Sequence, residues 1–454
     1  MIKKFFLSFL FLVLFIGSAN AELPEKIQKL RVAAEQGNAD AQFSLGEMYD
    51  DGQGVAQSSA EAVKWYRLAA EQGNAAAQTR VGWRYSIGNG VKKDDAEALK
   101  WYRLAAAQGN IEAQFYLGDM YFEGRGVKQD FAEARKYSHF AAEQGNAEAQ
   151  SMLGFHYRFG WGAIKQDDVE AVKWYRRSAD QGYADAQFSL GNMYYFGSVG
   201  VKQDYADALK WYQLAADQGS EYAQFKLGVM YANGEGINKD YTAVVKWYRL
   251  AAEQGNAPAQ FNLGFMYANG DGINQNYAEA EKWFRLAANQ GDATAQYNLG
   301  VMYANGHGIN KDYAAAAKWY RLAAEQGDAT AQCKLGVMYD LGEGVGKNYA
   351  DALKWYRLAA DQGDATAQLK LGLMYYLGNG IRQNYAEAVK YFRLSAMQED
   401  SVGQYVLGFC YESGDGVKQN KVIAKEWFGK ACDNGNQDGC DAYRRLNSAP
   451  TKLR

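Results

Sequence analysis

The residues that could carry catalysis or bind a metal are few in this chain, and their spacing suits neither role. The 454 residues contain three histidines, His139, His156 and His307, without a His-Glu-x-x-His pair or cysteines at the short spacing of a zinc site, which takes three or four protein ligands. Gly-x-Gly turns such as residues 306–308 recur, but each follows a helical pattern and lacks the later glycine of a dinucleotide-binding loop. Residues 271–274 lack the alternating acids and closing glutamate of a calcium loop. We therefore predict no cofactor, no metal site and no enzymatic activity.

A unit of 36 residues, repeated from Ala39 onward, must position whatever the chain binds. Eleven units each open on a glutamine, and the fourth and fifth units carry one extra residue in a turn; the glutamines are Gln42, Gln78, Gln114, Gln150, Gln187, Gln224, Gln260, Gln296, Gln332, Gln368 and Gln404. Such a period is typical of a solenoid, in which each unit buries its apolar face against its neighbours. We predict eleven repeats over residues 39–436, an N-terminal capping helix at 22–38 and a C-terminal capping helix with a tail at 437–454.

Each unit carries two helical patterns. Residues 39–49 and 60–72 each place small and apolar side chains on one face at about 100° per residue. A glycine recurs inside the first pattern, as at Gly46, although glycine costs a helix about 1 kcal/mol relative to alanine. We expect the ring of Trp65, and of its equivalents, to pack over this glycine.

The turns between the helical patterns have a consistent chemistry. Gly124 and Gly126 supply positive φ at little steric cost. Asp130 and Glu133 then have the spacing of a capping box, in which the first side chain accepts from a free backbone N–H and the acid reaches back. A glycine such as Gly73 follows the second helix as its left-handed C-cap. Two helices and two short turns per unit predict an all-α protein, an α/α solenoid.

Residues 1–21 have the features of a secretory signal peptide. Lys3 and Lys4 precede an apolar run over residues 5–16, and Ala-Asn-Ala at 19–21 forms a cleavage site. The run is shorter than the roughly 20 apolar residues of a membrane span, and no cysteine follows the site to accept a lipid. We expect cleavage after Ala21, no membrane span in the mature chain, and a periplasmic or secreted location. A net charge of −3 without a basic stripe excludes nucleic acid as the expected partner.

Cys432 and Cys440 have a spacing and register that favour a disulfide. Cys432 stands where Ala70 ends the second helix of its repeat, and Cys440 stands where Gln78 opens the next unit. These slots lie close wherever one helix turns into the next, and an exported protein meets oxidising conditions. We predict a bridge that clamps the last helix and adds roughly 2–3 kcal/mol.

The repeated Ala-x-Ala-Gln-x-x-Leu-Gly-x-Met-Tyr, Gly-x-Gly-Val and Ala-x-x-Trp-Tyr-Arg-Leu-Ala-Ala closely resemble the Sel1-like repeat, a relative of the tetratricopeptide repeat. The resemblance implies a right-handed superhelix whose first helices line a concave groove, and an adaptor that assembles protein complexes; exported bacterial members often contact host or envelope proteins. The cysteine pair is similar to that of the cysteine-rich branch of this family, where a bridge recurs in each unit, whereas here only the last junction carries one.

Some cysteine-rich relatives have been associated with β-lactam binding or hydrolysis, which gives one alternative function. A serine enzyme of that class needs Ser-x-x-Lys, and no serine after residue 21 has a lysine three positions on. A binder of carbohydrate or peptidoglycan is the other alternative, because stacked aromatic rings suit sugar faces.

Residues that vary between units while the core slots stay constant are the candidate binding residues. At the exposed slots of the first helices, repeats two to five carry large aromatic side chains and an arginine, which dominate binding hot spots: Trp83, Phe122, Phe155, Arg158, Phe159, Tyr195 and Phe196. These rings either bind a ligand in the groove or seal one repeat against the next, and both interpretations stay open at this stage. We predict a non-catalytic exported scaffold that binds a protein or peptide on its concave face, and no feature of the sequence specifies an oligomeric state.

Overall fold

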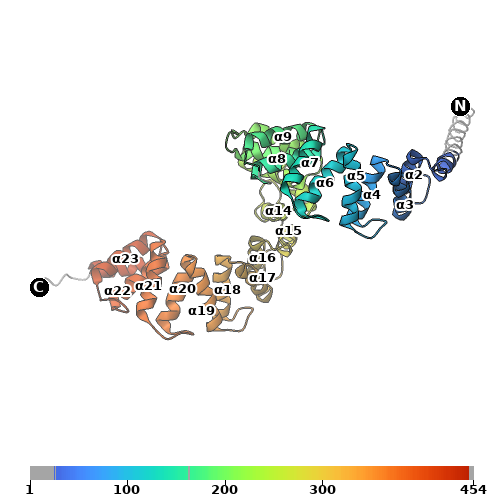
Figure 1. Ribbon diagram of the computed structural model, residues 1–454. Coiled ribbons are helices and arrows are strands. Elements are labelled where there is room, and N and C mark those ends of the chain that lie inside the picture. The colour runs from blue at the N-terminus through green and yellow to red at the C-terminus, as the bar shows by residue number, and fades with distance from the viewer. Residues whose placement is uncertain (1–24, 26, 162–163, 449–454) are drawn as a thin grey trace, which may run out of the picture. The chain divides into compact units, whose positions relative to one another are not determined.

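The computed structural model describes residues 25, 27–161 and 164–448, and within them helices build the whole architecture (Figure 1). The predicted signal peptide at 1–21 and the tail beyond residue 448 lie outside the described residues. The chain divides into two compact units, residues 1–223 and 224–454, and each is considered by itself. A single β-bridge, between Ser198 and Val201, interrupts the helical pattern of the described residues.

Two helices alternate through the chain, and we refer to them as the first and second helix of each repeat. A helix through residues 27–35 precedes the first repeat. The first helices are α2 (Ala39–Asp51), α4 (Ala75–Ile87), α6 (Ile111–Glu123), α8 (Ala147–Phe159), α10 (Ala184–Phe196), α12 (Glu221–Asn233), α14 (Ala257–Asn269), α16 (Ala293–Asn305), α18 (Ala329–Leu341), α20 (Ala365–Leu377) and α22 (Ser401–Ser413), followed by the terminal α24 (Gln437–Ser448). The second helices are α3 (Ser59–Glu71), α5 (Asp95–Ala107), α7 (Phe131–Glu143), α9 (Asp168–Asp180), α11 (Tyr205–Asp217), α13 (Tyr241–Glu253), α15 (Tyr277–Asn289), α17 (Tyr313–Glu325), α19 (Tyr349–Asp361), α21 (Tyr385–Met397) and α23 (Lys421–Asp433). The predicted all-α solenoid of eleven repeats is confirmed.

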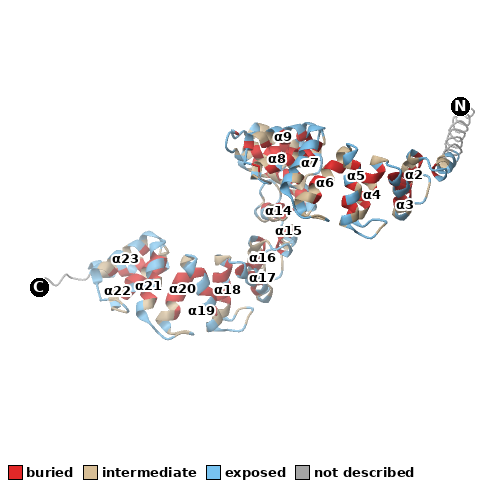
Figure 2. Ribbon diagram, in the orientation of Figure 1, coloured by how far each residue is buried: buried red, intermediate tan, exposed pale blue. Residues whose placement is uncertain are grey.

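The core is a chain of small clusters, each formed where the helices of adjacent repeats meet, rather than one central mass (Figure 2). In the first repeat Leu45 contributes from α2 and Ala62 and Tyr66 from α3, all with 1 % exposure or less. Because the same slots are filled in every unit, each repeat buries its apolar face only against its neighbours.

The helix glycines let the two helices of a repeat approach, but the ring that covers them is not the one we expected. A Cβ added at Gly46 would lie 2.6 Å from Cδ1 of Tyr66, and one at Gly82 would lie 2.8 Å from Cδ1 of Tyr102. The covering ring is therefore the tyrosine that follows the tryptophan, so the expected packing of Trp65 over Gly46 is wrong. The tyrosine points at the first helix because adjacent residues on a helix are rotated by about 100°.

The turns follow the predicted chemistry with one exception. Gly124 and Gly126 have φ of 73° and 68°, and Asp130 accepts hydrogen bonds from the N–H groups of Ala132 and Glu133. The N–H of Asp130, however, donates to the carbonyl of Tyr121 at 2.9 Å instead of to the Glu133 carboxylate. The capping box is thus half formed, because the hairpin brings the end of the first helix beneath this donor.

Buried glutamines join each repeat to the one before it. Gln42 is 4 % exposed, and its Nε2 donates to the Ala34 carbonyl at 3.0 Å. Its Oε1 accepts from Nε2 of Gln72, which ends the second helix of the same repeat, at 2.7 Å. Since a buried amide without partners is costly, this pair of bonds explains why a glutamine opens every unit.

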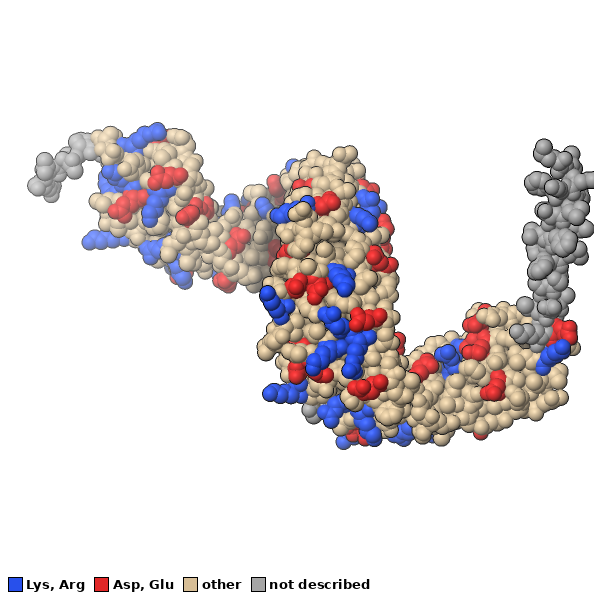
Figure 3. Space-filling model, turned by 90° about the horizontal axis from the view of Figure 1, so that it is seen from above, with Lys and Arg blue, Asp and Glu red and all other residues tan. Residues whose placement is uncertain are grey.

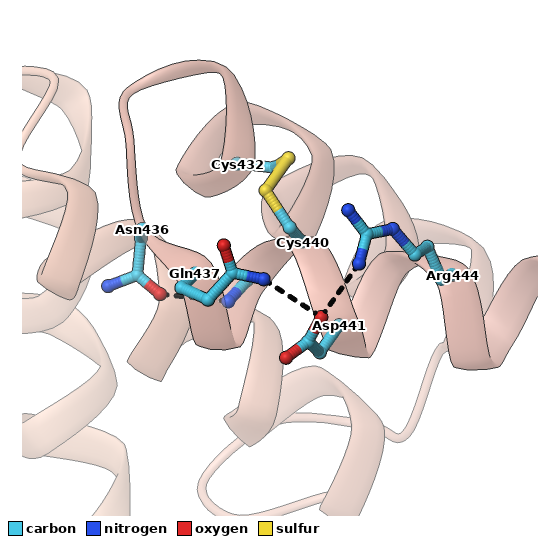
Figure 4. Close-up of a disulfide and its surroundings, with 7 residues drawn as sticks. Cys432, Asn436, Gln437, Cys440, Asp441 and Arg444 are labelled. Carbon is cyan, nitrogen blue, oxygen red and sulfur yellow. Dashed lines mark hydrogen bonds and ion pairs between the residues drawn. A yellow bond between two sulfur atoms is a disulfide. The ribbon is translucent and has the colours of Figure 1, made fainter.

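The end of the array carries the predicted disulfide between Cys432 of α23 and Cys440 of α24 (Figure 4). Asn436 caps α24 by accepting from the N–H of Gly439 at 2.8 Å. Asp441 accepts from Nε2 of Gln437 and from Nη1 of Arg444, both at 3.0 Å. Cys333 and Cys410 are free and buried.

Candidate functional site

A cleft of about 320 Å³ lies across the first helices α6, α8 and α10, in repeats three to five. Its walls combine aromatic rings with carboxylates, and the principal ones are Phe115, Asp119, Phe122, Glu148, Phe155 and Asp185. Apolar concavities with a few polar groups are the usual form of a binding site. The cleft is therefore the strongest candidate for a functional site in the first compact unit.

The repeat itself positions these side chains. In α8, Ala149, Gln150 and Leu153 are buried against the neighbouring helices α7 and α9. Glu148, two residues before the glutamine, and Phe155, five residues after it, project from the other side of the helix and line the cleft. The slots that the sequence identified as variable are thus the slots that face outward.

Three of the predicted aromatic residues come together beside the cleft. The Phe155 ring centroid lies 4.6 Å from that of Phe159 and 5.4 Å from that of Trp161. Phe122 stacks on Trp161 at 5.5 Å and on His156 at 5.1 Å. We call Phe122, Phe155, Phe159 and Trp161 the aromatic cluster; Phe155, Phe159 and Trp161 are 38 %, 51 % and 45 % exposed.

Two further predicted residues form a separate aromatic pair. Tyr195 and Phe196 meet edge to face at 4.8 Å at the end of α10, and Tyr195 also contacts Tyr205 of the following helix. Phe196 is 58 % exposed. Phe196 holds in repeat five the slot that Phe159 holds in repeat four.

Arg158 and Trp83 contact other residues of the solenoid. The Arg158 guanidinium lies 5.6 Å from the Phe159 ring centroid and hydrogen-bonds the sulfur of Met193 in the next repeat. Trp83 is half-buried against the core cluster around Leu117. For Trp83 the packing interpretation therefore accounts for most of the ring, whereas the aromatic cluster retains a large exposed surface.

Trp161 and His156 belong to the site, but sequence reasoning did not place them there. Trp161 lies in the connection that carries the extra residue of repeat four, which was the available signal. His156 replaces the methionine that stands at this slot in neighbouring units, as at Met120 and Met193. It lines the cleft, is 3 % exposed, and its Nε2 has no hydrogen-bond partner. Burial lowers the pKa of His156 to about 4, so the ring is neutral at pH 7.

A row of acids crosses the site, one in the first turn of each first helix. Glu112, Glu148 and Asp185 hold the same slot in α6, α8 and α10. Burial raises the pKa of Glu148, and the negative charges of Glu112 and Asp185 raise it further. Burial also raises the pKa of Tyr183 to about 12, again with a contribution from Asp185 and Glu148. The row thus holds an excess of negative charge that a cation would relieve.

At the opposite edge of the cleft the protein supplies a cation of its own. Arg125 pairs with both Asp119 and Glu123. Burial raises the pKa of Asp119, and Arg125 opposes that effect. A guanidinium therefore already fits among the carboxylates of this surface.

Other features of the described residues are weaker candidates for a functional site. A cleft of about 420 Å³ at the last repeat junction is lined by Met397, Glu399, Trp427 and Lys430, without clustered aromatic rings. Within the described ranges, no group of three or more His, Cys, Asp and Glu side chains could hold a metal ion, and no helix is long and apolar enough to cross a bilayer. Lys and Arg are interspersed with Asp and Glu on the face seen in Figure 3.

Comparison with known proteins agrees with the repeat register. The Sel1 repeat matches residues 39–74, 75–110, 111–146, 147–183, 184–220, 221–256, 257–292, 293–328, 329–364, 365–400 and 401–436. A similar solved structure is c5321, a protective antigen of uropathogenic Escherichia coli strains with an SLR fold, at 38 % identity and TM-score 0.82, covering 94 % of this chain and 91 % of that one. A Sel1 repeat protein from Oxalobacter formigenes is 32 % identical at TM-score 0.54, covering 70 % of this chain and 95 % of that one. No curated protein gave a significant match.

Proposed function

The chain belongs to the Sel1 repeat family, whose members are typically protein-interaction scaffolds, and we propose that it is a non-catalytic exported scaffold that binds a protein or peptide. The binding surface is the outward face of the first helices, the face expected to line the concave groove. The observation that carries the proposal is the aromatic cluster, in which Phe155, Phe159 and Trp161 stay exposed beside a cleft that spans three repeats. Exposed aromatic groups of this kind mark interaction sites.

Export is supported by two features. The disulfide between Cys432 and Cys440 is typical of oxidising compartments. The relative c5321 is described as a protective antigen, a description that suits an exported protein. Detection of the mature chain, beginning at Glu22, in periplasmic or culture fractions tests this part of the proposal.

The binding surface can be tested with a displayed library of random peptides. We expect enriched peptides to bind the wild-type protein and to lose at least about tenfold in affinity on Phe155→Ala/Phe159→Ala/Trp161→Ala, because truncating each hot-spot ring costs more than about 1 kcal/mol. A matched control removes three side chains of similar exposure from second helices, Leu250→Ala/Leu286→Ala/Leu322→Ala. Equal binding by both variants at unchanged helical circular dichroism contradicts the proposed surface.

Carbohydrate binding is the second candidate, favoured by the exposed Trp161 ring beside Phe155. An exposed tryptophan face suits the face of a sugar ring. A glycan array that includes peptidoglycan fragments separates the two candidates, since binding there that is lost on Trp161→Ala favours the sugar.

A further inference from the structure

Within the row of acids formed by Glu112, Glu148 and Asp185, one carboxylate has a basic partner on the preceding repeat. Arg80, on the first helix of repeat two, lies 3.6 Å from the carboxylate of Glu112 on the first helix of repeat three. Arg80 stands two residues after its repeat glutamine, and Glu112 stands two residues before the next one. An arginine in one repeat therefore reaches the acid of the following repeat.

The next two repeats keep the acid but omit the arginine. The slots equivalent to Arg80 hold Tyr116 and Met152, so neither Glu148 nor Asp185 receives a guanidinium from the preceding helix. Asp119 and Glu123 are satisfied by Arg125, which leaves Glu148 and Asp185 as the carboxylates of the cleft without a basic partner. The aromatic rings of Phe122 and Phe155 line the same space.

His156 is a second, independent feature that favours a ligand with hydrogen-bond donors. Its side chain is 97 % buried, lines this cleft, and leaves Nε2 without a partner. Buried polar atoms in native proteins are nearly always paired. In the tautomer protonated at Nδ1, Nε2 of the neutral imidazole offers an acceptor, as do the two carboxylates. A guanidinium offers five N–H donors in a planar group that also stacks on aromatic rings.

We propose that the cleft of repeats three to five binds an arginine side chain of the protein partner. This arginine lies beside Glu148 and Asp185 as Arg80 lies beside Glu112. The inference rests on the proposed function, because it specifies what the peptide bound at this face must contain. The carboxylates of Glu148 and Asp185 accept hydrogen bonds from the guanidinium. Phe122 and Phe155 contact its planar faces and the apolar residues beside it.

The test uses the same displayed peptide library, followed by synthetic versions of an enriched peptide. Arginine is enriched in the selected sequences, and replacing it with citrulline, which has similar shape and no charge, weakens binding tenfold or more. Glu148→Gln/Asp185→Asn weakens the arginine peptide to the level of the citrulline peptide, since the charge-assisted bonds are lost. The affinity of the wild-type protein also falls as salt is raised.

The control removes equivalent charges from the opposite side of the same repeats. Glu170 and Asp207 are first-turn acids of the second helices α9 and α11, so Glu170→Gln/Asp207→Asn perturbs helix dipoles and net charge in the same way. This control variant binds the arginine peptide as the wild type does. Circular dichroism of both variants verifies the fold.

An arginine introduced into the cleft should prevent the peptide from binding. Met152→Arg places an arginine at the slot equivalent to Arg80, within the cleft, where it pairs with Asp185 as Arg80 pairs with Glu112. It abolishes arginine-peptide binding although the carboxylates remain.

The outcomes separate this inference from the proposed function. Peptides that require the aromatic cluster but contain no enriched arginine, or bind equally to Glu148→Gln/Asp185→Asn, overturn the arginine site and leave the proposed function standing. A library that yields no peptide dependent on the aromatic cluster overturns both.

Discussion

Replacing Gly300 with alanine tests whether the approach of two helices, rather than helix propensity, decides the identity of this slot. Gly300 lies in the middle of α16, where alanine would gain about 1 kcal/mol from propensity alone. A Cβ there would lie 2.5 Å from Cδ1 and Cε1 of Tyr320 and 3.0 Å from its Cγ. The Tyr320 ring is 4 % exposed, so the strain is relieved only by displacing packed neighbours.

The magnitude follows from these two opposing terms. Overpacking a well-filled core costs about 1–3 kcal/mol, and an overlap near 1 Å with a ring places this site at the upper end. We expect Gly300→Ala to lower the free energy of unfolding by about 2 kcal/mol after the propensity gain is subtracted. In a Tyr320→Ala background the same change should be neutral or stabilising.

Gly429→Ala is the matched control. Gly429 is also in the interior of a helix, α23, but its added Cβ would meet Tyr443 at 3.4 Å, which is ordinary contact. The control should therefore stabilise by about 1 kcal/mol. Because repeat arrays need not unfold in one step, the assay is urea unfolding followed by circular dichroism together with hydrogen exchange of each helix. A stabilising Gly300→Ala, or the absence of coupling to Tyr320, refutes the reasoning.

Three other perturbations have expected outcomes. Arg84→Met breaks a largely buried ion pair with Asp50 and should cost about 3 kcal/mol in urea unfolding, most of it recovered in Asp50→Ala/Arg84→Met. Replacing Cys432 and Cys440 with alanine should cost about 2.5 kcal/mol, seen as faster hydrogen exchange in α24 but not in α2. Above the unfolded pKa of histidine near 6.5, neutral His156 leaves the free energy of unfolding at its full value. As pH falls toward the folded pKa of about 4, that free energy should drop by about 3 kcal/mol, because the unfolded state takes up a proton that the buried ring does not. The His156→Met variant should lack this drop.

The fold was predictable because each repeat encodes its helices and turns locally. The sequence pattern was wrong only about which of two neighbouring residues makes a given contact. Trp65 and Tyr66 both recur, and periodicity cannot decide which ring faces Gly46 when both lie near the same edge of a helix. The half-formed capping box has a similar cause. The N–H of Asp130 finds the Tyr121 carbonyl, a partner that exists only once the hairpin has closed.

The candidate site was predictable only where it obeys the repeat. Comparing slots between units identified Phe122, Phe155 and Phe159, because these residues vary at positions that face outward. Trp161 lies in a connection where the register shifts by one residue, so no slot comparison includes it. His156 occupies a buried slot that methionine fills in the neighbouring units, so its place in the repeat predicts packing and not binding.

The two kinds of slot explain how such an array can carry one site without losing its fold. The buried glutamines and the helix glycines recur because they pack one helix against the next. Most binding residues therefore stand at outward positions that this packing does not use, and the buried His156 is the exception. Glu148 shows the consequence: it stands one residue before the buried Ala149, and other repeats tolerate alanine, threonine or valine at its slot, as at Ala76, Thr294 and Val402. An acid retained there beside Glu112 and Asp185, against its own desolvation, is not required by the helix. It therefore supports the proposed arginine site.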